Sequence, residues 1–408
     1  MSAQHEALAS LLDNDLYKFT MQYAVLKHYK DVKVVCQFTN REKELRLNGQ
    51  AVDWLLGQIK DMNNLALTAK EREFMLSLPY FDESYISYLS NFRYRPLEQV
   101  KTRFDPATED FELEVTGLWH EVILYEVPLL ALISEAYFRF VDRDWNYDGQ
   151  AQKAEEKATA LLERGCVFSE FGTRRRRDFK THDIVMGGIH KAHQAYKARG
   201  GGKGTVMGTS NVYLAMKYGV NAIGTVAHEF FMGVSALEGI KHANRVTLER
   251  WYEIYHGALG IALTDTFTTP IFLQDFNRDL AEKFAGVRQD SGNPADFVPL
   301  MVNHYKSLGI DPKTKVIVFS DALNVKRAIE LLDIAEKAGI QASFGIGTSF
   351  TNDFVKISSG ERSKPLNIVI KLKECEGKRV IKLSDDVLKY SADMETINQF
   401  KKELGISI

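Results

Sequence analysis

A series of short apolar runs between residues 166 and 348 constrains the fold of this chain more than any other feature of its sequence. Each run ends in a polar or glycine-rich cluster and is followed by helix-like sequence. This alternation is typical of parallel strands that are buried on both faces and connected by helices. The runs occupy residues 166–172, 204–210, 222–228, 261–265, 286–291, 316–321 and 342–348.

Polar side chains follow every one of these runs, and this distribution favours a barrel over an open sheet. An α/β barrel forms its active site at the rim where all the strands end. An open doubly wound sheet concentrates its ligand groups at one or two switch points instead. We therefore predict a closed barrel in residues 141–372, of an irregular type because the runs are unevenly spaced.

Sequence outside the barrel region predicts a second, α+β domain. Residues 1–140 include residues 111–115, whose polar and apolar side chains alternate as in a half-buried strand. Residues 366–372 and 379–383 flank a turn and predict a hairpin. We expect the tail, residues 373–408, to pack against the N-terminal region. The predicted fold is therefore an irregular α/β barrel with an additional α+β domain.

The composition excludes several classes of partner. The 408 residues include 52 Lys and Arg against 54 Asp and Glu, a net charge of −2, which argues against nucleic acid or an anionic membrane. Cys36, Cys166 and Cys375 lack CxxC spacing, which suggests a reducing compartment without disulfides or a cysteine zinc site. The N-terminus lacks a signal-like pattern, and no apolar run reaches the roughly 18 residues of a membrane span. We expect a cytoplasmic protein.

The run of arginines after residue 171 is the first motif with chemical potential. Phe171 could offer a ring face to a flat ligand, and Arg174 could hold a phosphate or carboxylate through its planar fork. Residues 174–177 fit a solvated basic helix start equally well. A patch that binds RNA is a further interpretation of the same arginines.

Two glycine-rich clusters resemble anion sites formed by backbone amides at a helix start. In the first, Gly208 and a threonine precede Ser210, although Ser and Asn are also ordinary helix caps. The second contains Gly345, Gly347 and Thr348 and follows a late strand, where many α/β barrels bind a monophosphate.

His228 and Asp265 end two neighbouring runs and predict a paired imidazole and carboxylate. A carboxylate that accepts one imidazole proton fixes the tautomer and leaves the other nitrogen available for attack. A lone histidine is more often a satisfied core residue, but the presence of Asp265 weakens that interpretation.

Arg288, Asp290, Ser320 and Asp321 form a mixed-charge group at the ends of two adjacent runs. The arginine suits a phosphate, and the carboxylates suit ribose hydroxyls or Mg²⁺. The sequence that follows Asp290 is also typical of a surface turn. A turn alone does not explain Arg288 and Asp290 on the strand before it.

Taken in order, FGTRRR, GTSN, GTVAHE, GVRQDSGNP and FGIGTS resemble the nicotinate phosphoribosyltransferases, which are type II phosphoribosyltransferases. The resemblance runs from Asp13 to Asp385. It implies the two-part fold described above and a homodimer whose active sites use both subunits. It also implies that nicotinate and 5-phosphoribosyl-1-pyrophosphate give nicotinate mononucleotide and pyrophosphate in NAD salvage. ATP hydrolysis through a phosphohistidine would be coupled to this step, with Mg²⁺ present.

The resemblance also implies roles for individual residues. Phe171 and the partner subunit's Tyr17 would sandwich the pyridine ring, and Arg288 and Ser210 would meet its carboxylate. His228 would be phosphorylated and Asp265 would orient it. The remaining implied contacts are Arg174 with phosphates, Asp290 and Asp321 with ribose and metal (Asp290 as the Mg²⁺ ligand), Ser320 with substrate, and Gly345, Gly347 and Thr348 with the 5′-phosphate.

Three other functions stay open. A relative of the same fold that uses nicotinamide is expected to carry an aspartate where Ser210 stands, since aspartate accepts from an amide and repels a carboxylate. An RNA-binding protein would use residues 174–177. A sugar-phosphate isomerase or aldolase would need a base or a Schiff-base lysine at a strand end, and no run here ends in lysine.

Overall fold

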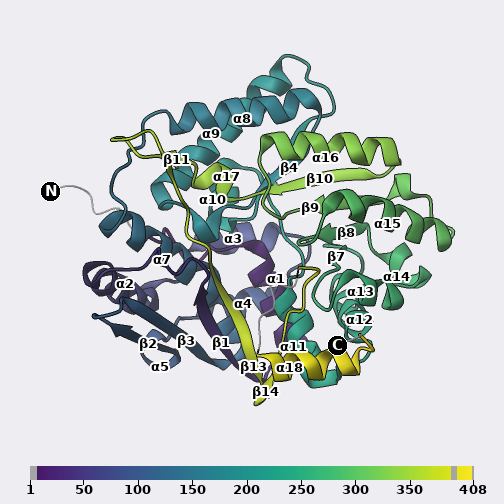
Figure 1. The fold of residues 1–408 in the computed structure, drawn as a ribbon, viewed down its shortest axis with the longest axis horizontal. Helices are drawn as coiled ribbons and strands as arrows, with labels where there is room; N and C mark the ends of the chain where they lie inside the picture. Colours follow the sequence, from purple (N-terminus) through teal and green to yellow (C-terminus); the bar gives the residue numbers. More distant parts are fainter. Residues whose placement is uncertain (1–6, 387–392, 407–408) are drawn as a thin grey trace.

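The computed structural model describes residues 7–386 and 393–406. These residues form a parallel sheet of seven strands, an antiparallel sheet of five and a small two-stranded sheet. In Figure 1 the antiparallel sheet lies at the lower left, and the parallel sheet lies above and to the right of it. Two layers of different topology therefore meet along one side of the barrel.

The parallel sheet confirms the predicted strands, because each of the seven apolar runs contributes one. The strands lie in the order β6-β5-β4-β10-β9-β8-β7. They are β4 (Val167–Glu170), β5 (Thr205–Thr209), β6 (Asn221–Ala222), β7 (Ile261–Leu263), β8 (Gly286–Gln289), β9 (Val316–Phe319) and β10 (Gln341–Ile346). The predicted irregular α/β barrel with an additional α+β part is confirmed.

The prediction of a closed barrel is wrong. β6 and β7 are the two edges of the sheet, and among the described residues no ladder joins them. Residues 222–228 were predicted as one strand, but β6 ends at Ala222 and His228 begins a helix. Edge strands of two and three residues offer too few backbone groups to pair across the gap.

Helix α1 (Leu16–His28) fills the seam between β6 and β7. The Thr20 hydroxyl donates to the Thr225 carbonyl at 3.1 Å, and Tyr255 donates to the Thr20 carbonyl at 2.6 Å. On the far side, the Thr225 hydroxyl lies 3.3 Å from the carbonyl of Ile261, the first residue of β7. Hydrogen bonds from a helix of the N-terminal region thus replace the missing strand pairing.

The antiparallel sheet joins the two ends of the chain. Its order is β14-β13-β1-β3-β2, with β13 paired to β1 from Val34 opposite Cys375 to Asn40 opposite Ile368. The predicted hairpin is confirmed, although its second strand is shorter than expected, and the domain boundary predicted at residue 372 falls inside β13. The strands are β1 (Lys33–Asn40), β2 (Val100–Asp105), β3 (Asp110–Leu118), β13 (Ile368–Cys375) and β14 (Lys378–Arg379).

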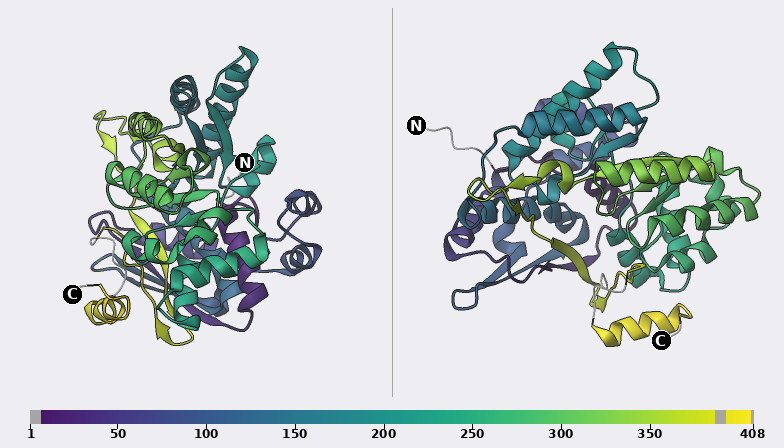
Figure 2. Two further views of the ribbon diagram at one scale, coloured as in Figure 1. Left: turned by 90° about the vertical axis from the view of Figure 1, so that its right-hand side faces the viewer. Right: turned by 45° about the horizontal axis from the view of Figure 1, so that its top comes forward.

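The tail divides between the two parts of the molecule. The hairpin joins the N-terminal sheet, as expected. Helix α18 (Met394–Glu403) differs from the prediction, because Phe400 stacks on Phe267 of the barrel region with ring centroids 6.2 Å apart. Figure 2 shows this helix on the outside of the molecule. Residues 1–6, 387–392 and 407–408 of the predicted domains lie outside the described residues.

Helices cover both parts, and glycines in the left-handed region end several of them, such as α8 at Gly165 and α16 at Gly339. In the N-terminal part these are α2 (Gly49–Asp61), α3 (Ala69–Ser77), α4 (Glu83–Asn91), α5 (Pro96–Gln99), α6 (Trp119–Val122) and α7 (Glu126–Phe140). In the barrel part they are α8 (Gln150–Arg164), α9 (Phe179–Ala198), α10 (Val212–Tyr218), α11 (His228–Glu238), α12 (Ala243–Tyr255), α13 (Thr269–Asp275), α14 (Arg278–Lys283), α15 (Pro294–Ser307), α16 (Val325–Ala338) and α17 (Thr348–Thr351).

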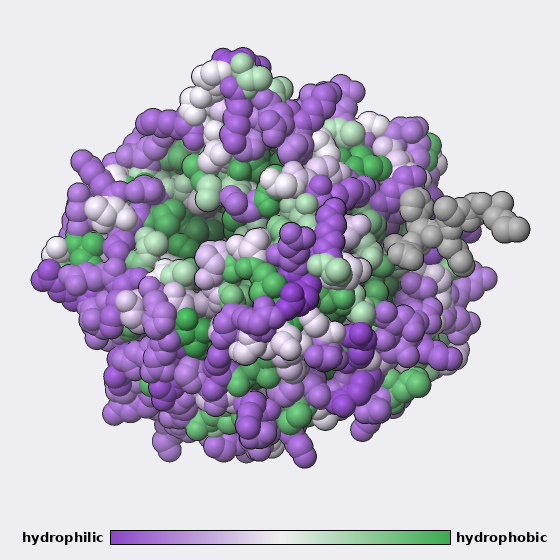
Figure 3. Space-filling model, turned by 180° about the vertical axis from the view of Figure 1, so that it is seen from behind, coloured by the Kyte–Doolittle hydropathy of each residue, from purple (hydrophilic) through white to green (hydrophobic). Residues whose placement is uncertain are grey.

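The surface seen from behind in Figure 3 is mainly hydrophilic, with an apolar hollow left of centre. Within residues 7–386 and 393–406, no helix combines the length and the apolar character that crossing a membrane requires.

A buried ion pair fixes the start of the chain to the barrel. The guanidinium of Arg176 donates to the two carboxylate oxygens of Asp13 at 2.7 and 2.8 Å, and both side chains are fully buried. Asn211 donates to the same carboxylate at 2.7 Å. The amide of Leu16 then donates to the Ser210 carbonyl at 2.8 Å, and α1 begins there. This network places α1 in the seam.

We expect Arg176→Ala to lower the free energy of unfolding by about 3–5 kcal/mol, because it leaves the Asp13 carboxylate buried without its cation. Denaturant unfolding would measure the loss. Arg199→Ala is the matched control, since Arg199 forms an exposed pair with Glu163 and such pairs contribute about 0–1 kcal/mol. Equal losses in the two variants would contradict a special role for the buried pair.

Candidate active site

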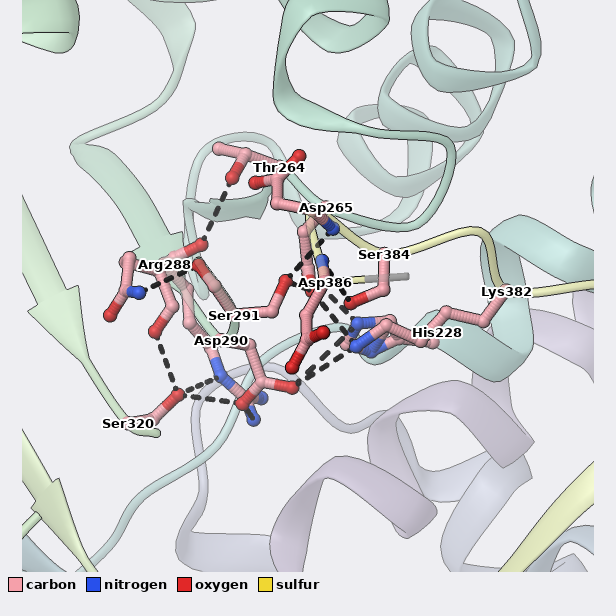
Figure 4. Close-up of polar contacts among 12 residues, drawn as sticks. His228, Thr264, Asp265, Arg288, Asp290, Ser291, Ser320, Lys382, Ser384 and Asp386 are labelled. Atoms are coloured by element: carbon pink, nitrogen blue, oxygen red, sulfur yellow. Dashed lines mark hydrogen bonds and ion pairs between the residues drawn. The ribbon is translucent and has the colours of Figure 1, made fainter. Parts of the chain in front are cut away.

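An imidazole and a buried carboxylate meet at the barrel rim. His228 is the first residue of α11, and its Nε2 lies 2.9 Å from Oδ1 of Asp265, which follows β7. The second oxygen of Asp265 accepts from Ser291 at 2.5 Å and pairs with the Lys382 ammonium at 2.8 Å. Figure 4 shows these side chains converging from separate segments. The structure thus brings the predicted His228 and Asp265 together.

The environment of His228 favours a neutral imidazole. Burial and the nearby Lys382 ammonium lower the pKa of His228 well below its usual range, while Asp290 opposes the shift. Because Asp265 accepts at Nε2, the proton of the neutral ring belongs on that nitrogen. Nδ1 then keeps its lone pair and can act as a nucleophile or base.

Arg288, Asp290 and Ser320 form the second predicted group, beside His228 (Figure 4). Arg288 donates to Asp290 and to Ser320 at 2.8 Å each, and Ser320 donates to the same carboxylate oxygen at 2.9 Å. The other oxygen of Asp290 lies 3.7 Å from His228 Nε2. Burial raises the pKa of Asp290, but Arg288 and Lys382 together hold it well below its usual range. Asp290 is therefore a carboxylate.

Tyr17 and Arg174 lie together at another part of the rim. Glu126, the first residue of α7, connects them: the Tyr17 hydroxyl and an Arg174 nitrogen each lie 3.5 Å from one of its oxygens. We expected Tyr17 to enter the site of a partner subunit. Within one chain, Tyr17 and Arg174 share Glu126, and the role of Tyr17 in the site of a partner subunit stays a prediction.

Arg174 connects the two parts of the rim. Tyr17 and Glu126 raise the pKa of Arg174 above its ordinary value, and so do Asp15 on one side and Asp290 on the other. Its side chain is 40% exposed, whereas its neighbours Arg176 and Arg177 are buried. Arg174 is therefore exposed enough to meet a ligand, unlike Arg176 and Arg177.

Ser210 does not offer the hydroxyl that was expected for a ligand carboxylate. It is buried, and its hydroxyl donates to Asp15 Oδ1 at 2.7 Å. Burial raises the pKa of Asp15, which Arg174 opposes. A carboxyl group of the chain therefore occupies the position next to Ser210, and a role of Ser210 in binding a base stays a prediction.

The glycines near residue 346 are explained first by Phe171. A Cβ on Gly345 would lie 2.3 Å from a ring carbon of Phe171, so glycine is needed there for the ring to fit. The Phe171 amide donates to the Ile346 carbonyl at 2.8 Å. Gly347 and Thr348 stand at the start of α17. A phosphate cradle at these residues stays a prediction.

Sequence reasoning missed a group of cations that face the rim from the antiparallel sheet and the tail. Lys371 lies on β13, and burial together with Arg41 and Lys382 lowers its pKa to about 7. Burial, Arg174 and Arg41 lower the pKa of Arg175 to about 10. Cations that depress one another in this way are suited to a ligand with several negative charges.

Asp321 belongs to the same region. Its charge raises the pKa values of Arg41 and Arg175, whereas burial and the neighbouring cations lower them.

The other arginines of the run, Arg176 and Arg177, have structural roles. Arg177 donates to the Ser363 hydroxyl at 2.9 Å and lies over the Phe138 ring at 3.6 Å. The interpretation of residues 174–177 as a solvated basic helix start is therefore wrong. A patch that binds RNA would lack Arg176 and Arg177, the two buried arginines of the four.

His228, Asp265 and Asp290 bring potential metal ligand atoms within 4.8 Å of one another. The Lys382 ammonium lies 2.8 Å from Asp265 and 3.5 Å from Asp290, so it already neutralises both carboxylates. Mg²⁺ is usually held by one or two carboxylates together with substrate phosphates. This donor set fits a metal that arrives with a polyphosphate better than a resident ion.

Comparison with known proteins agrees with this geometry. Residues 166–408 match the model of the nicotinate phosphoribosyltransferase family, and residues 12–134 match the model of its N-terminal domain. A probable nicotinate phosphoribosyltransferase of Schizosaccharomyces pombe is 47% identical over 98% of this chain and 99% of that protein. The nicotinate phosphoribosyltransferase of Saccharomyces cerevisiae is 44% identical over 98% of this chain and 95% of its own length.

Solved structures show the same architecture. A structure from Saccharomyces cerevisiae, 43% identical, superposes with a TM-score of 0.95 over 99% of both chains. The nicotinate phosphoribosyltransferase of Porphyromonas gingivalis, 37% identical, gives a TM-score of 0.89 over 97% of this chain and 99% of the other.

Proposed function

The chain belongs to the nicotinate phosphoribosyltransferase family, and from this premise we propose how its site carries out and couples the reaction. It is an enzyme of nicotinate metabolism that transfers a phosphoribosyl group. Nicotinate and 5-phosphoribosyl-1-pyrophosphate are its substrates, and nicotinate mononucleotide and pyrophosphate are its products. The finer assignments below rest on the side chains gathered at the rim.

In the transfer step the pyridine nitrogen bonds to C1 of the ribose as the bond from C1 to the pyrophosphate oxygen breaks. Asp290, held as a carboxylate, can stabilise the positive charge that develops on the ribose. Arg41, Arg175 and Lys371 suit the departing pyrophosphate because they crowd the rim with positive charge. Phe171 would stack on the pyridine ring.

The imidazole of His228, which the structure pairs with Asp265, is the observation that carries the proposed coupling to ATP. Its Nδ1 would attack the terminal phosphorus of ATP and release ADP, and water would later release phosphate. Asp265 would hold the Nε2 proton throughout, since it lies 2.9 Å away. A phosphoryl group here also gains from the N-terminus of α11, whose amides favour negative charge. Mg²⁺ would accompany the polyphosphates, with Asp290 as one ligand.

The predicted homodimer, the cytoplasmic location and the role in NAD salvage are proposals as well. The three cysteines are free and buried, which agrees with a reducing compartment. Fractionation of cells would test the location, and loss of growth on nicotinate as NAD precursor would test the pathway.

We expect His228→Ala to abolish ATP hydrolysis and labelling of the protein by γ-labelled ATP, and to leave a slow transfer that does not depend on ATP. The reason is that the variant lacks the phosphate acceptor but keeps the carboxylates and arginines around the ribose. The assay is formation of labelled nicotinate mononucleotide with Mg²⁺, with and without ATP.

His242→Ala is the matched control, because His242 also pairs with a carboxylate, Asp275, at 2.8 Å, but at the start of α12. It should retain ATP hydrolysis. ATP hydrolysis that persists in His228→Ala would show that the phosphohistidine assignment is wrong.

We expect Arg288→Ala to raise the KM for nicotinate about 10- to 150-fold, the effect of losing one charge-assisted hydrogen bond of about 1.5–3 kcal/mol. Arg278→Ala removes an exposed helical arginine that pairs with Glu282 and should leave KM unchanged. Nicotinamide is measured in parallel, since Asp15 puts a carboxyl group beside Ser210. An unchanged KM for nicotinate would remove Arg288 from the base site, and a preference for nicotinamide would overturn the choice of substrate.

The contacts of Tyr17 make the shared-site proposal testable by mixing subunits. We expect a mixture of Tyr17→Ala and Arg288→Ala chains to recover activity that neither variant shows alone, because one of the two sites in each mixed dimer then combines an intact Tyr17 with an intact Arg288. Activity is measured after unfolding and refolding the two chains together. A mixture that stays as weak as either variant alone would instead show that Tyr17 serves the site of its own chain, where it shares Glu126 with Arg174.

A further inference from the structure

The tail brings a buried ammonium to the active site. Residues 380–386 belong to no helix or strand, and Lys382 reaches from them toward His228 and Asp265 (Figure 4). The Lys382 side chain is 7% exposed, and its ammonium lies 2.8 Å from Asp265 and 3.5 Å from Asp290. Contacts other than secondary structure must therefore hold this ammonium in place.

Asp385 attaches the tail segment to the start of α13. Its two carboxylate oxygens accept from the amide and the hydroxyl of Thr269 at 2.6 and 2.5 Å. Thr269 is the first residue of α13, and among the described residues the side chain of the preceding Thr268 makes no capping hydrogen bond. Asp385 therefore caps a helix that its own sequence leaves uncapped.

Two backbone amides of the tail strengthen this attachment. The Leu383 amide donates to the Thr266 carbonyl at 2.8 Å. The Asp385 amide donates to the Ser291 hydroxyl at 3.1 Å, and that hydroxyl donates to Asp265 at 2.5 Å. These contacts run from the tail to the same carboxylate that the ammonium meets. We call residues 264–269 and 382–385, joined in this way, the clasp.

The backbone on both sides of the clasp adopts conformations that are rare for its residues. Thr268 has a φ of 73° and Ser384 a φ of 64°. A positive φ is unfavourable for a residue with a branched Cβ, and it persists only where the surrounding contacts hold it. Asp385 follows Ser384 and bonds the residue after Thr268, so its carboxylate holds both positions.

The charge of Lys382 affects how closely a polyphosphate can approach the carboxylates of the rim. Asp265 and Asp290 are 1% and 22% exposed, so water screens their negative charges poorly. The ammonium beside them offsets part of that charge. A ligand with several negative charges is therefore repelled less while the ammonium stays in place.

We propose that Asp385 is a positioning residue that, through the clasp, holds the Lys382 ammonium beside Asp265 and Asp290 and so raises the affinity for 5-phosphoribosyl-1-pyrophosphate. The inference rests on the proposed binding of polyphosphate next to these carboxylates, and it adds the residue that prepares the site for that ligand. With both oxygens on Thr269, Asp385 acts through Lys382 and not on the substrate itself.

The test compares Lys382→Met, Asp385→Ala and the double variant with the unaltered enzyme. The KM for 5-phosphoribosyl-1-pyrophosphate, the KM for nicotinate and kcat are measured with Mg²⁺. We expect Lys382→Met to raise the first KM about 10-fold or more, the effect of losing one charged partner. Asp385→Ala should raise it as well, while the KM for nicotinate stays close to that of the unaltered enzyme. The double variant should be no weaker than Lys382→Met, because without the ammonium the clasp has no charge to position.

Asp393→Ala is the matched control for the loss of a cap in the tail. Asp393 accepts from the amide and the hydroxyl of Thr396 at 3.0 and 3.1 Å at the start of α18, the same two contacts that Asp385 makes with Thr269. Its KM for 5-phosphoribosyl-1-pyrophosphate should equal that of the unaltered enzyme. Asp385→Asn keeps an oxygen that can accept from the Thr269 amide, so it should recover part of the affinity. An Asp385→Asn variant as weak as Asp385→Ala would show that Asp385 acts through its charge, which overturns the clasp.

The remaining outcomes separate this inference from the proposed function. An unchanged KM in Asp385→Ala, or a double variant whose loss is the product of the two single losses, overturns the role of Asp385 and leaves the polyphosphate where it was proposed to bind. An unchanged KM in Lys382→Met overturns that placement and this inference with it. If Asp385→Ala does not fold, Thr269→Val carries the same test, since it removes the hydroxyl contact and keeps the amide contact, and an unchanged KM there overturns the inference.

Discussion

The buried pair of Asp13 and Arg176 is the interaction on which the rest of the site depends. A guanidinium and a carboxylate that are both removed from water are stable only together, so the start of the chain and the loop after β4 must become ordered as one unit. Once they do, the Leu16 amide donates to the Ser210 carbonyl, and α1 begins in the seam of the barrel. The position of Tyr17 follows from that start.

Because the barrel is open between β6 and β7, the site takes its polar side chains from two sources. A closed barrel would supply all its polar groups from strand ends. Here the carboxylates proposed to contact the ribose lie at strand ends and the proposed phosphate acceptor lies on α11, whereas Tyr17 and Asp15 come from the segment that enters the gap. The antiparallel sheet then adds Lys371, whose pKa the charges of Asp265 and Asp290 raise against its burial. Positive charge from one layer thus faces negative charge from the other across the space where a polyphosphate would bind.

Much of this arrangement could be predicted from sequence because it is local. Each parallel strand is a short apolar run, and Arg288, Asp290 and Ser320 follow adjacent runs, so their proximity follows from parallel pairing. The burial of individual arginines in residues 174–177 could not be predicted, because four identical side chains in a row give no local indication of which ones are buried. Lys371 was missed because a lysine at an alternate position of β13 is also typical of a solvated strand face. Only the placement of that sheet over the rim makes it part of the site.

His228 begins a helix instead of ending a strand, and this difference from the prediction changes the chemistry available to its ring. At the end of a strand, its ring would have only side chains around it. As the first residue of α11, it lies where helix amides lack partners and favour a negative group, which suits a phosphorylated ring.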